Sequence, residues 1–104
     1  MSDTVFDLKF AEEAENDIRN ILAWYSSQSQ TTSNKFVESV DELFEFLSAN
    51  PHSFSKQRKN FRVAYVKKFP YGVIYEITAN VVLILRIIHT SRNPRRRFRR
   101  LKRK

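Results

Sequence analysis

The chain contains no cysteine and a single glycine among its 104 residues. Without cysteine it has no disulfide, no thiolate metal site and no cysteine nucleophile, which is compatible with a reducing compartment. One glycine is too few for the glycine-rich loops that cradle phosphates. Its two histidines, His52 and His89, lie far apart without the spacing of a zinc site, and no carboxylate pair stands out. We therefore expect no metal, no cofactor and no conventional hydrolase site.

Long apolar segments are also missing. The longest run, VVLILRII, contains Arg86 and is far shorter than the about 20 residues that a membrane helix needs, so we interpret it as a buried strand. The opening residues, MSDTVFDLKF, are acidic and have no apolar core followed by a cleavage site, as an export signal would. We expect a cytoplasmic protein that does not bind membranes.

Acidic residues are almost absent from the second half of the chain. Residues 1–50 hold ten acids and three bases, whereas residues 51–104 hold sixteen bases and one acid, Glu76. This polarity predicts a nucleic acid or an acidic protein segment as partner of the second half. Nine of the last thirteen residues are basic, and for the last six a solvated tail without a partner is the alternative interpretation.

The hydrophobic periodicity predicts an α+β domain. Strands are expected at 4–10, 60–68, 72–78 and 81–89, and helices at 11–28 and 32–50. Thr32 or Ser33 is the expected N-cap of the second helix. The order β-α-α-β-β-β favours an antiparallel sheet with a helical hairpin packed on one face and residues 81–89 as the most central strand. We expect one domain over residues 1–94, followed by a basic tail over 95–104.

Basic side chains near strand ends are the candidates for function, because arginine binds two phosphate oxygens at once. Arg62, His89 and Arg92 are the candidate functional surface. Further candidates for binding nucleic acid or an acidic partner are Lys67, Lys68, Arg95, Arg96, Arg97, Arg99 and Arg100. Each interpretation has a structural alternative: Arg86 pairs with Glu76, His89 caps a strand end, and Tyr65, Tyr71 and Tyr75 pack in the core.

Three motifs in this order of elements resemble the RelE/ParE superfamily of toxins from bacterial type II toxin–antitoxin modules: WY late in the first helix, FPYGVIYEI in the middle, and HTSRNP after the last strand. The resemblance covers nearly the whole chain. It implies a cognate antitoxin as partner. The positive charge of the second half of the chain suggests that this antitoxin has an acidic segment. It also places His89, Arg92 and Pro94 where the family turns out of its last strand.

The superfamily includes ribonucleases that cut message on the ribosome without a metal, and ParE-type inhibitors of DNA gyrase. Arg62 and Arg92 match basic positions of the ribonucleases, but Ala64, Gly72 and Phe98 stand where that branch has two bases and a proton-transferring group. The resemblance is therefore closer to ParE, and implies a plasmid-stabilisation toxin that inhibits gyrase rather than an enzyme. Lys67, Lys68 or Arg95 to Arg97 could supply the missing charge, so a ribosome-dependent endonuclease stays open. A non-toxic nucleic-acid-binding module is a third possibility.

Overall fold

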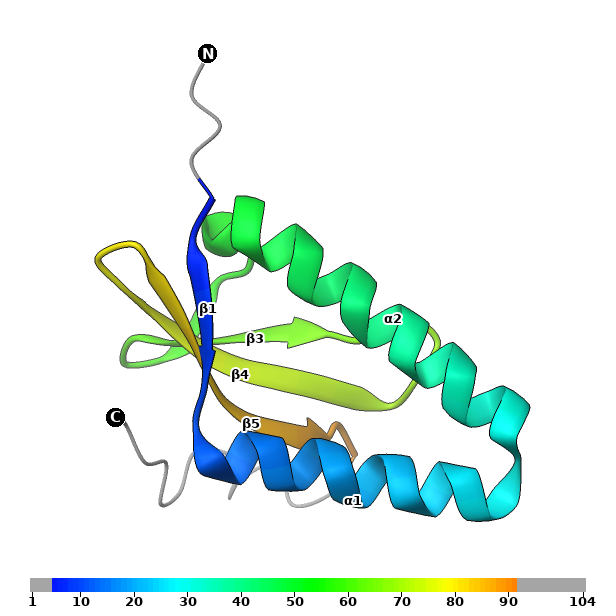
Figure 1. Ribbon diagram of the computed structural model, residues 1–104. Coiled ribbons are helices and arrows are strands. Elements are labelled where there is room, and N and C mark those ends of the chain that lie inside the picture. Colours follow the sequence, from blue (N-terminus) through cyan, green and yellow to red (C-terminus); the bar gives the residue numbers. More distant parts are fainter. Residues whose placement is uncertain (1–4, 92–104) are drawn as a thin grey trace.

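The computed structural model describes residues 5–91, so the expectations for the tail and for the boundary at residue 94 lie outside it. Its elements are β1 (Asp7–Phe10), α1 (Glu12–Gln28), α2 (Gln30–Ala49), the short 3₁₀ helix η1 (Pro51–Ser53), β2 (Lys56–Arg58), β3 (Phe61–Tyr65), β4 (Tyr71–Thr78) and β5 (Val81–His89). The two helices pack on one side of a five-stranded sheet (Figure 1). This confirms the α+β class and the helical hairpin.

The sheet has the order β1-β5-β4-β3-β2 and is mixed, not wholly antiparallel. The pairs among β2, β3, β4 and β5 are antiparallel, whereas β1 lies parallel to β5, with Asp7 opposite Val81 and Phe10 opposite Ile84. The sequence analysis placed β5 at the centre, but β4 is the middle strand and β5 is its interior neighbour. It also missed β2, a short, fully exposed strand whose polar residues carry no alternating pattern.

The helix pair forms because apolar residues recur along one side of each helix. Their buried residues, among them Phe36, Val40 and Leu47, pack against Val73, Tyr75 and Ile84 of the sheet in the main core. Ser29 alone joins the helices: its backbone N–H donates to the Tyr25 carbonyl, and its hydroxyl accepts from the Thr32 N–H at 3.2 Å. The cap is therefore Ser29, and the expected Thr32 or Ser33 was wrong.

The face of the sheet opposite the helices carries a second, smaller apolar cluster. It consists of Phe61, Val63, Ile74, Leu83 and Leu85, together with Ala11. We call the sheet face that bears these residues the open face, because among residues 5–91 neither helix packs on it (Figure 1). Two apolar clusters, one on each face, explain why β4 and β5 are apolar along nearly their whole length.

Candidate functional site

Arg62 has a structural contact. It lies half-buried on the helix side of β3, opposite Tyr75 of β4, and its Nη1 donates to the Phe54 carbonyl oxygen at 2.5 Å. This bond holds the segment after η1 against the sheet. Part of the guanidinium fork that the sequence assigned to phosphate is thus engaged by the backbone of the chain itself.

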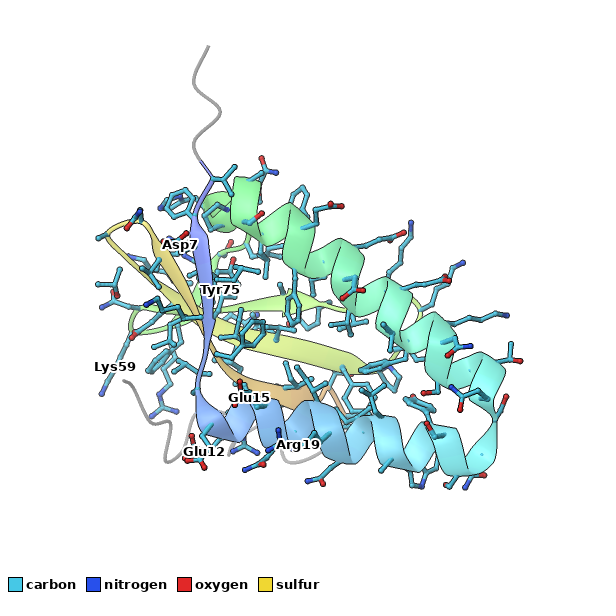
Figure 2. The ribbon with its side chains drawn as sticks, in the orientation of Figure 1. Asp7, Glu12, Glu15, Arg19, Lys59 and Tyr75 are labelled. Atoms are coloured by element: carbon cyan, nitrogen blue, oxygen red, sulfur yellow. The ribbon has the colours of Figure 1, made fainter. Side chains whose placement is uncertain are left out.

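Tyr75 joins the same region from the centre of the sheet (Figure 2). Its buried hydroxyl donates to the Pro51 carbonyl oxygen at 2.7 Å. Burial raises the pKa of Tyr75 to about 12, and the positive charge of Arg62 lowers it by a smaller amount. The phenol therefore stays protonated and acts as a structural donor, and the expectation that Tyr75 is a core residue is confirmed.

His89 lies at the last position of β5, where several chemically useful groups meet. Its ring packs edge-on against Tyr71, with centroids 5.4 Å apart. The backbone N–H of Ser91 donates to His89 Nδ1 at 3.3 Å, and the Ser91 hydroxyl lies 3.0 Å from the same nitrogen. A ring nitrogen that accepts from an N–H carries no proton, so in the neutral imidazole the proton is on Nε2.

The turn from β3 to β4 brings two lysines to this place. Lys67 and Lys68 are exposed, and the turn is tied to the end of β5 because the Thr90 N–H donates to the Pro70 carbonyl at 2.9 Å. We call Lys67, Lys68, His89, Thr90 and Ser91 the His89 end. Arg92, Arg95, Arg96, Arg97, Arg99 and Arg100 lie outside the described residues, and the chain leads to them directly from this end.

Arg62 and His89 do not lie together. Arg62 is opposite Tyr75 and His89 is opposite Tyr71, so they differ by four positions along β4 and flank it on opposite sides. At about 3.4 Å per residue this is roughly 14 Å along the strands, before the distance across β4 is added. One small ligand cannot bridge them, and Lys67 and Lys68 are the nearer basic neighbours of His89.

Aromatic rings from both helices pack against Phe69 and Tyr71, next to the His89 end. Tyr25 of α1 and Phe36 of α2 each pack edge-on against Phe69 and Tyr71, at centroid distances of 5.3 to 6.4 Å. Burial and the neighbouring Tyr71 hydroxyl raise the pKa of Tyr25. The sequence analysis missed this cluster, although the WY pair and the aromatic residues of FPY were its signal.

Two further structural interpretations need correction. Arg86 does pair with a carboxylate, but that carboxylate is Asp17 of α1 and not Glu76, because β4 register places Glu76 opposite Leu83. Tyr71 is partly buried against the main core as expected, whereas Tyr65 is 48% exposed at the end of β3 and its hydroxyl accepts from Gln57 at 3.0 Å.

Among residues 5–91 no three His, Asp or Glu side chains gather closely enough to hold an ion. Over the same residues, neither helix is sufficiently apolar and long to cross a bilayer.

A family model described as the ParE toxin of the type II toxin–antitoxin system parDE matches residues 8–94, which is most of the chain. The chain belongs to the ParE toxin family. The resemblance to the RelE/ParE superfamily, inferred from the WY, FPYGVIYEI and HTSRNP motifs, is confirmed.

Solved structures share this ParE-family fold. A chain of the chromosomal ParDE toxin–antitoxin system from Pseudomonas aeruginosa superposes with a TM-score of 0.72 and 17% sequence identity, covering 85% of this chain and 99% of that one. A chain of the toxin–antitoxin complex RelBE2 from Mycobacterium tuberculosis gives 0.59 and 20%, covering 85% and 94%. At these identities the likeness shows the fold alone. Comparison with curated protein sequences gave no match.

Two positions that the ribonuclease branch fills with bases are closed in this ParE-family chain. Ala64 is fully buried in the main core beneath the helices. At Gly72 an added Cβ atom would lie 3.0 Å from Val63 Cγ1 and 3.5 Å from Tyr65 Cδ1, so even a small side chain would require its neighbours to shift. The third position, Phe98, lies outside the described residues.

Proposed function

We propose that this chain is the toxin of a two-component plasmid-stabilisation module and that it acts in the cytoplasm by inhibiting DNA gyrase. Membership of the ParE family supports the toxin assignment. The observation that carries the choice of target is the packing at Ala64 and Gly72. A base at position 64 would be buried in the core, and position 72 has no room for one without rearrangement. On this proposal the chain inhibits a protein and does not cleave RNA.

A cognate antitoxin is the proposed partner, by analogy with the ParDE and RelBE2 assemblies. The basic second half of the chain favours an acidic antitoxin segment, since complementary charge accelerates encounter and fixes register. Lys67, Lys68 and the arginines from Arg92 onward are the proposed contacts. The same bases would meet phosphates if the toxin touches the DNA bound to its target.

The alternative is a metal-independent ribonuclease that acts on the ribosome, and one observation favours it. The His89 end combines an imidazole, whose Nε2 is the protonated nitrogen, with the exposed lysines Lys67 and Lys68. Such groups could transfer a proton and stabilise a phosphate in the transition state. Arg62, which belongs to the ribonuclease pattern, lies too far from them to contribute to the same small site.

Induced expression in a bacterium separates the two activities. A gyrase inhibitor activates a DNA-damage reporter before amino-acid incorporation falls, whereas a ribonuclease abolishes incorporation first. Primer extension on a message translated with the purified protein completes the test. We expect no discrete cuts; cuts that disappear in His89→Ala and Lys68→Ala would replace the gyrase proposal with the ribonuclease.

A further inference from the structure

The single tryptophan of the chain, Trp24, lies on the surface of α1. Its side chain is 57% exposed in the folded chain, and its ring packs edge-on against Tyr25. We propose that Trp24 is the anchor through which this toxin binds its protein target, next to the His89 end, and that the antitoxin does not use it. The inference deepens the proposed function and rests on it only in requiring that the chain acts on a protein.

The helix α1 runs alongside β5 in the same direction (Figure 1). At its start the Ala11 N–H donates to the Ile84 carbonyl at 2.8 Å, and further on the Asp17 carboxylate accepts from the Ile87 N–H at 2.9 Å. Six helical residues rise about 9 Å and three strand residues span about 10 Å, so the two elements advance together. The side of α1 that bears Asp17 therefore faces the edge of β5.

Trp24 lies on that side of α1, level with the His89 end. It follows Asp17 by seven residues, which is nearly two complete turns and about 10.5 Å along the helix. The same distance on β5 covers about three residues beyond Ile87 and reaches Thr90, which belongs to the His89 end. One interface of standard size, about 800 Å² on each partner, can cover both Trp24 and the His89 end.

A row of aromatic rings connects Trp24 to His89. Trp24 packs on Tyr25 with centroids 5.1 Å apart, Tyr25 packs on Tyr71 at 6.4 Å, and Tyr71 packs on His89 at 5.4 Å. These contacts hold the indole ring in a fixed position relative to the basic groups before any partner binds. A surface that is already ordered loses less conformational entropy on binding.

The surface around Trp24 is uncharged. Residues 20–34 are NILAWYSSQSQTTSN, the longest stretch of the chain without Asp, Glu, Lys or Arg. The helical neighbours of Trp24, three and four positions away, are Asn20, Ile21, Ser27 and Gln28. Interfaces between proteins have this composition, because tryptophan is enriched at their centre and Lys, Glu and Asp are depleted there. The pattern therefore indicates a protein partner.

The charges of the molecule favour the target over a nucleic acid or the antitoxin. Phosphates are held by basic side chains, and the surface around Trp24 supplies none. An acidic antitoxin segment is attracted to Lys67 and Lys68 and gains nothing from an uncharged surface. The occupant is a protein with an apolar pocket for the indole ring and carboxylates that face the two lysines. Target and antitoxin then compete for the His89 end, and the target alone covers Trp24.

Growth arrest and antitoxin binding together test this role. Trp24→Ala should require about tenfold more protein than the unchanged chain for the same growth arrest, as expected for a tryptophan at the centre of an interface. Trp24→Phe should keep part of the effect. The affinity of both variants for the purified cognate antitoxin should be unchanged. Circular dichroism shows whether each variant keeps the fold.

The control variant is Val5→Ala. Val5 is 62% exposed and precedes β1, whose first residue, Asp7, lies opposite Val81 at the far end of β5 from His89. The control should change neither growth arrest nor antitoxin binding. Weaker antitoxin binding by Trp24→Ala would assign Trp24 to the antitoxin, and full growth arrest by Trp24→Ala would exclude it from the target contact. Either result overturns the proposal.

The indole ring can also report the contact directly, because Trp24 is the only tryptophan. With 5-hydroxytryptophan at position 24, the ring is excited separately from the tryptophans of gyrase, and acrylamide quenching measures its exposure. Purified gyrase should reduce the quenching severalfold, whereas the antitoxin or a single-stranded oligonucleotide should leave it unchanged. Protection by the oligonucleotide, or protection that grows with the concentration of the chain itself, would overturn the proposal.

The two proposals fail in different ways. If gyrase is inhibited by the unchanged chain but does not protect the ring at position 24, the role of Trp24 is wrong and the gyrase assignment stands. If gyrase is neither inhibited nor able to protect the ring, the gyrase assignment is wrong. The growth-arrest comparison of Trp24→Ala with Val5→Ala then decides whether Trp24 contacts a different target.

Discussion

Asp17 of α1 and Arg86 of β5 form a two-point ion pair at the edge of the sheet. Arg86 Nε donates to Asp17 Oδ2 at 2.7 Å and Nη2 donates to Oδ1 at 3.1 Å. The Ile87 backbone N–H donates to the same Oδ2 at 2.9 Å. Since β1 pairs with β5 only as far as Ile84, the Asp17 carboxylate continues the edge pairing where the strand has ended. The hydrogen bond to Asp17 is the largest cause that raises the pKa of Arg86.

Removing this carboxylate should destabilise the fold. Asp17→Ala leaves both the guanidinium and the Ile87 N–H without their acceptor, and we expect a loss of about 2 to 3 kcal/mol in the free energy of unfolding. The pair is partly exposed, which keeps the loss below that of a fully buried pair. Urea unfolding measures it. Glu15→Ala, on the exposed side of the same helix, should change stability by less than about 0.5 kcal/mol; equal losses would refute this role of Asp17.

Tyr75 should give the fold a pH dependence in alkali. Its pKa is about 12 in the folded chain against an ordinary value of 10.0, so the folded state holds the proton more tightly. This contribution to stability is complete below pH about 10 and is lost as the pH rises toward about 12. Tyr75→Phe should be about 1 kcal/mol less stable at neutral pH, because it loses the bond to Pro51. The difference between the two proteins should shrink between pH about 10 and 12 in urea unfolding; a constant difference would contradict it.

Position 64 should reject the base that a ribonuclease needs. Ala64→Lys would bury an ammonium group beneath the helix pair, and we expect a loss on the order of 4 kcal/mol or more, enough to unfold much of the protein. Tyr65→Lys is the matched control, since it introduces the same side chain at the next residue, which is 48% exposed. Its cost should be about 1 kcal/mol or less. Thermal unfolding compares both variants with the unchanged chain. An Ala64→Lys variant that unfolds at nearly the same temperature as the unchanged chain would show that position 64 can hold a base and would contradict the prediction.

The elements of this fold were readable because their patterns depend on local burial. The bounds of β5 were predicted to the residue, and those of α1, α2 and β4 to within two residues. The parallel placement of β1 was not readable, because alternation shows which side chains are buried and not which strand lies alongside. Likewise the sequence placed Asp17 among several acids on the exposed side of a helix. Its pairing with Arg86 follows from the end of β1 at Phe10, which leaves the next part of β5 without a neighbouring strand.

The site was less predictable because it is assembled from distant segments. Arg62 and His89 were grouped by their positions near strands, yet register separates them along β4. Lys67 and Lys68 were named as candidates for binding nucleic acid or an acidic partner, without a link to His89, and the structure brings them to His89 through the contact of Thr90 with Pro70. The hydrophobic periodicity of a sequence predicts helices and strands, but it does not predict which turn lies beside the end of which strand.

The His89 end should matter more than other basic turns. Lys68→Glu should reduce growth arrest and slow binding to an acidic antitoxin, with the larger part of the effect in the association rate at low salt. Lys59→Glu is a close control: both lysines are exposed turn residues with positive φ, 70° and 52°, and Lys59 lies at the other end of β3 (Figure 2). Stopped-flow binding compares them. If the two variants associate with the antitoxin equally slowly, the overall positive charge of the chain controls binding and the His89 end has no special role.

A supercoiling assay is the most direct test of the proposed action of this ParE-family chain on gyrase. Relaxed plasmid, ATP and purified gyrase are incubated with increasing amounts of the protein. We predict that supercoiling falls with dose, that cleaved plasmid accumulates, and that equimolar Lys68→Glu is weaker than Lys59→Glu. Full supercoiling at a large molar excess of folded protein would contradict the assignment.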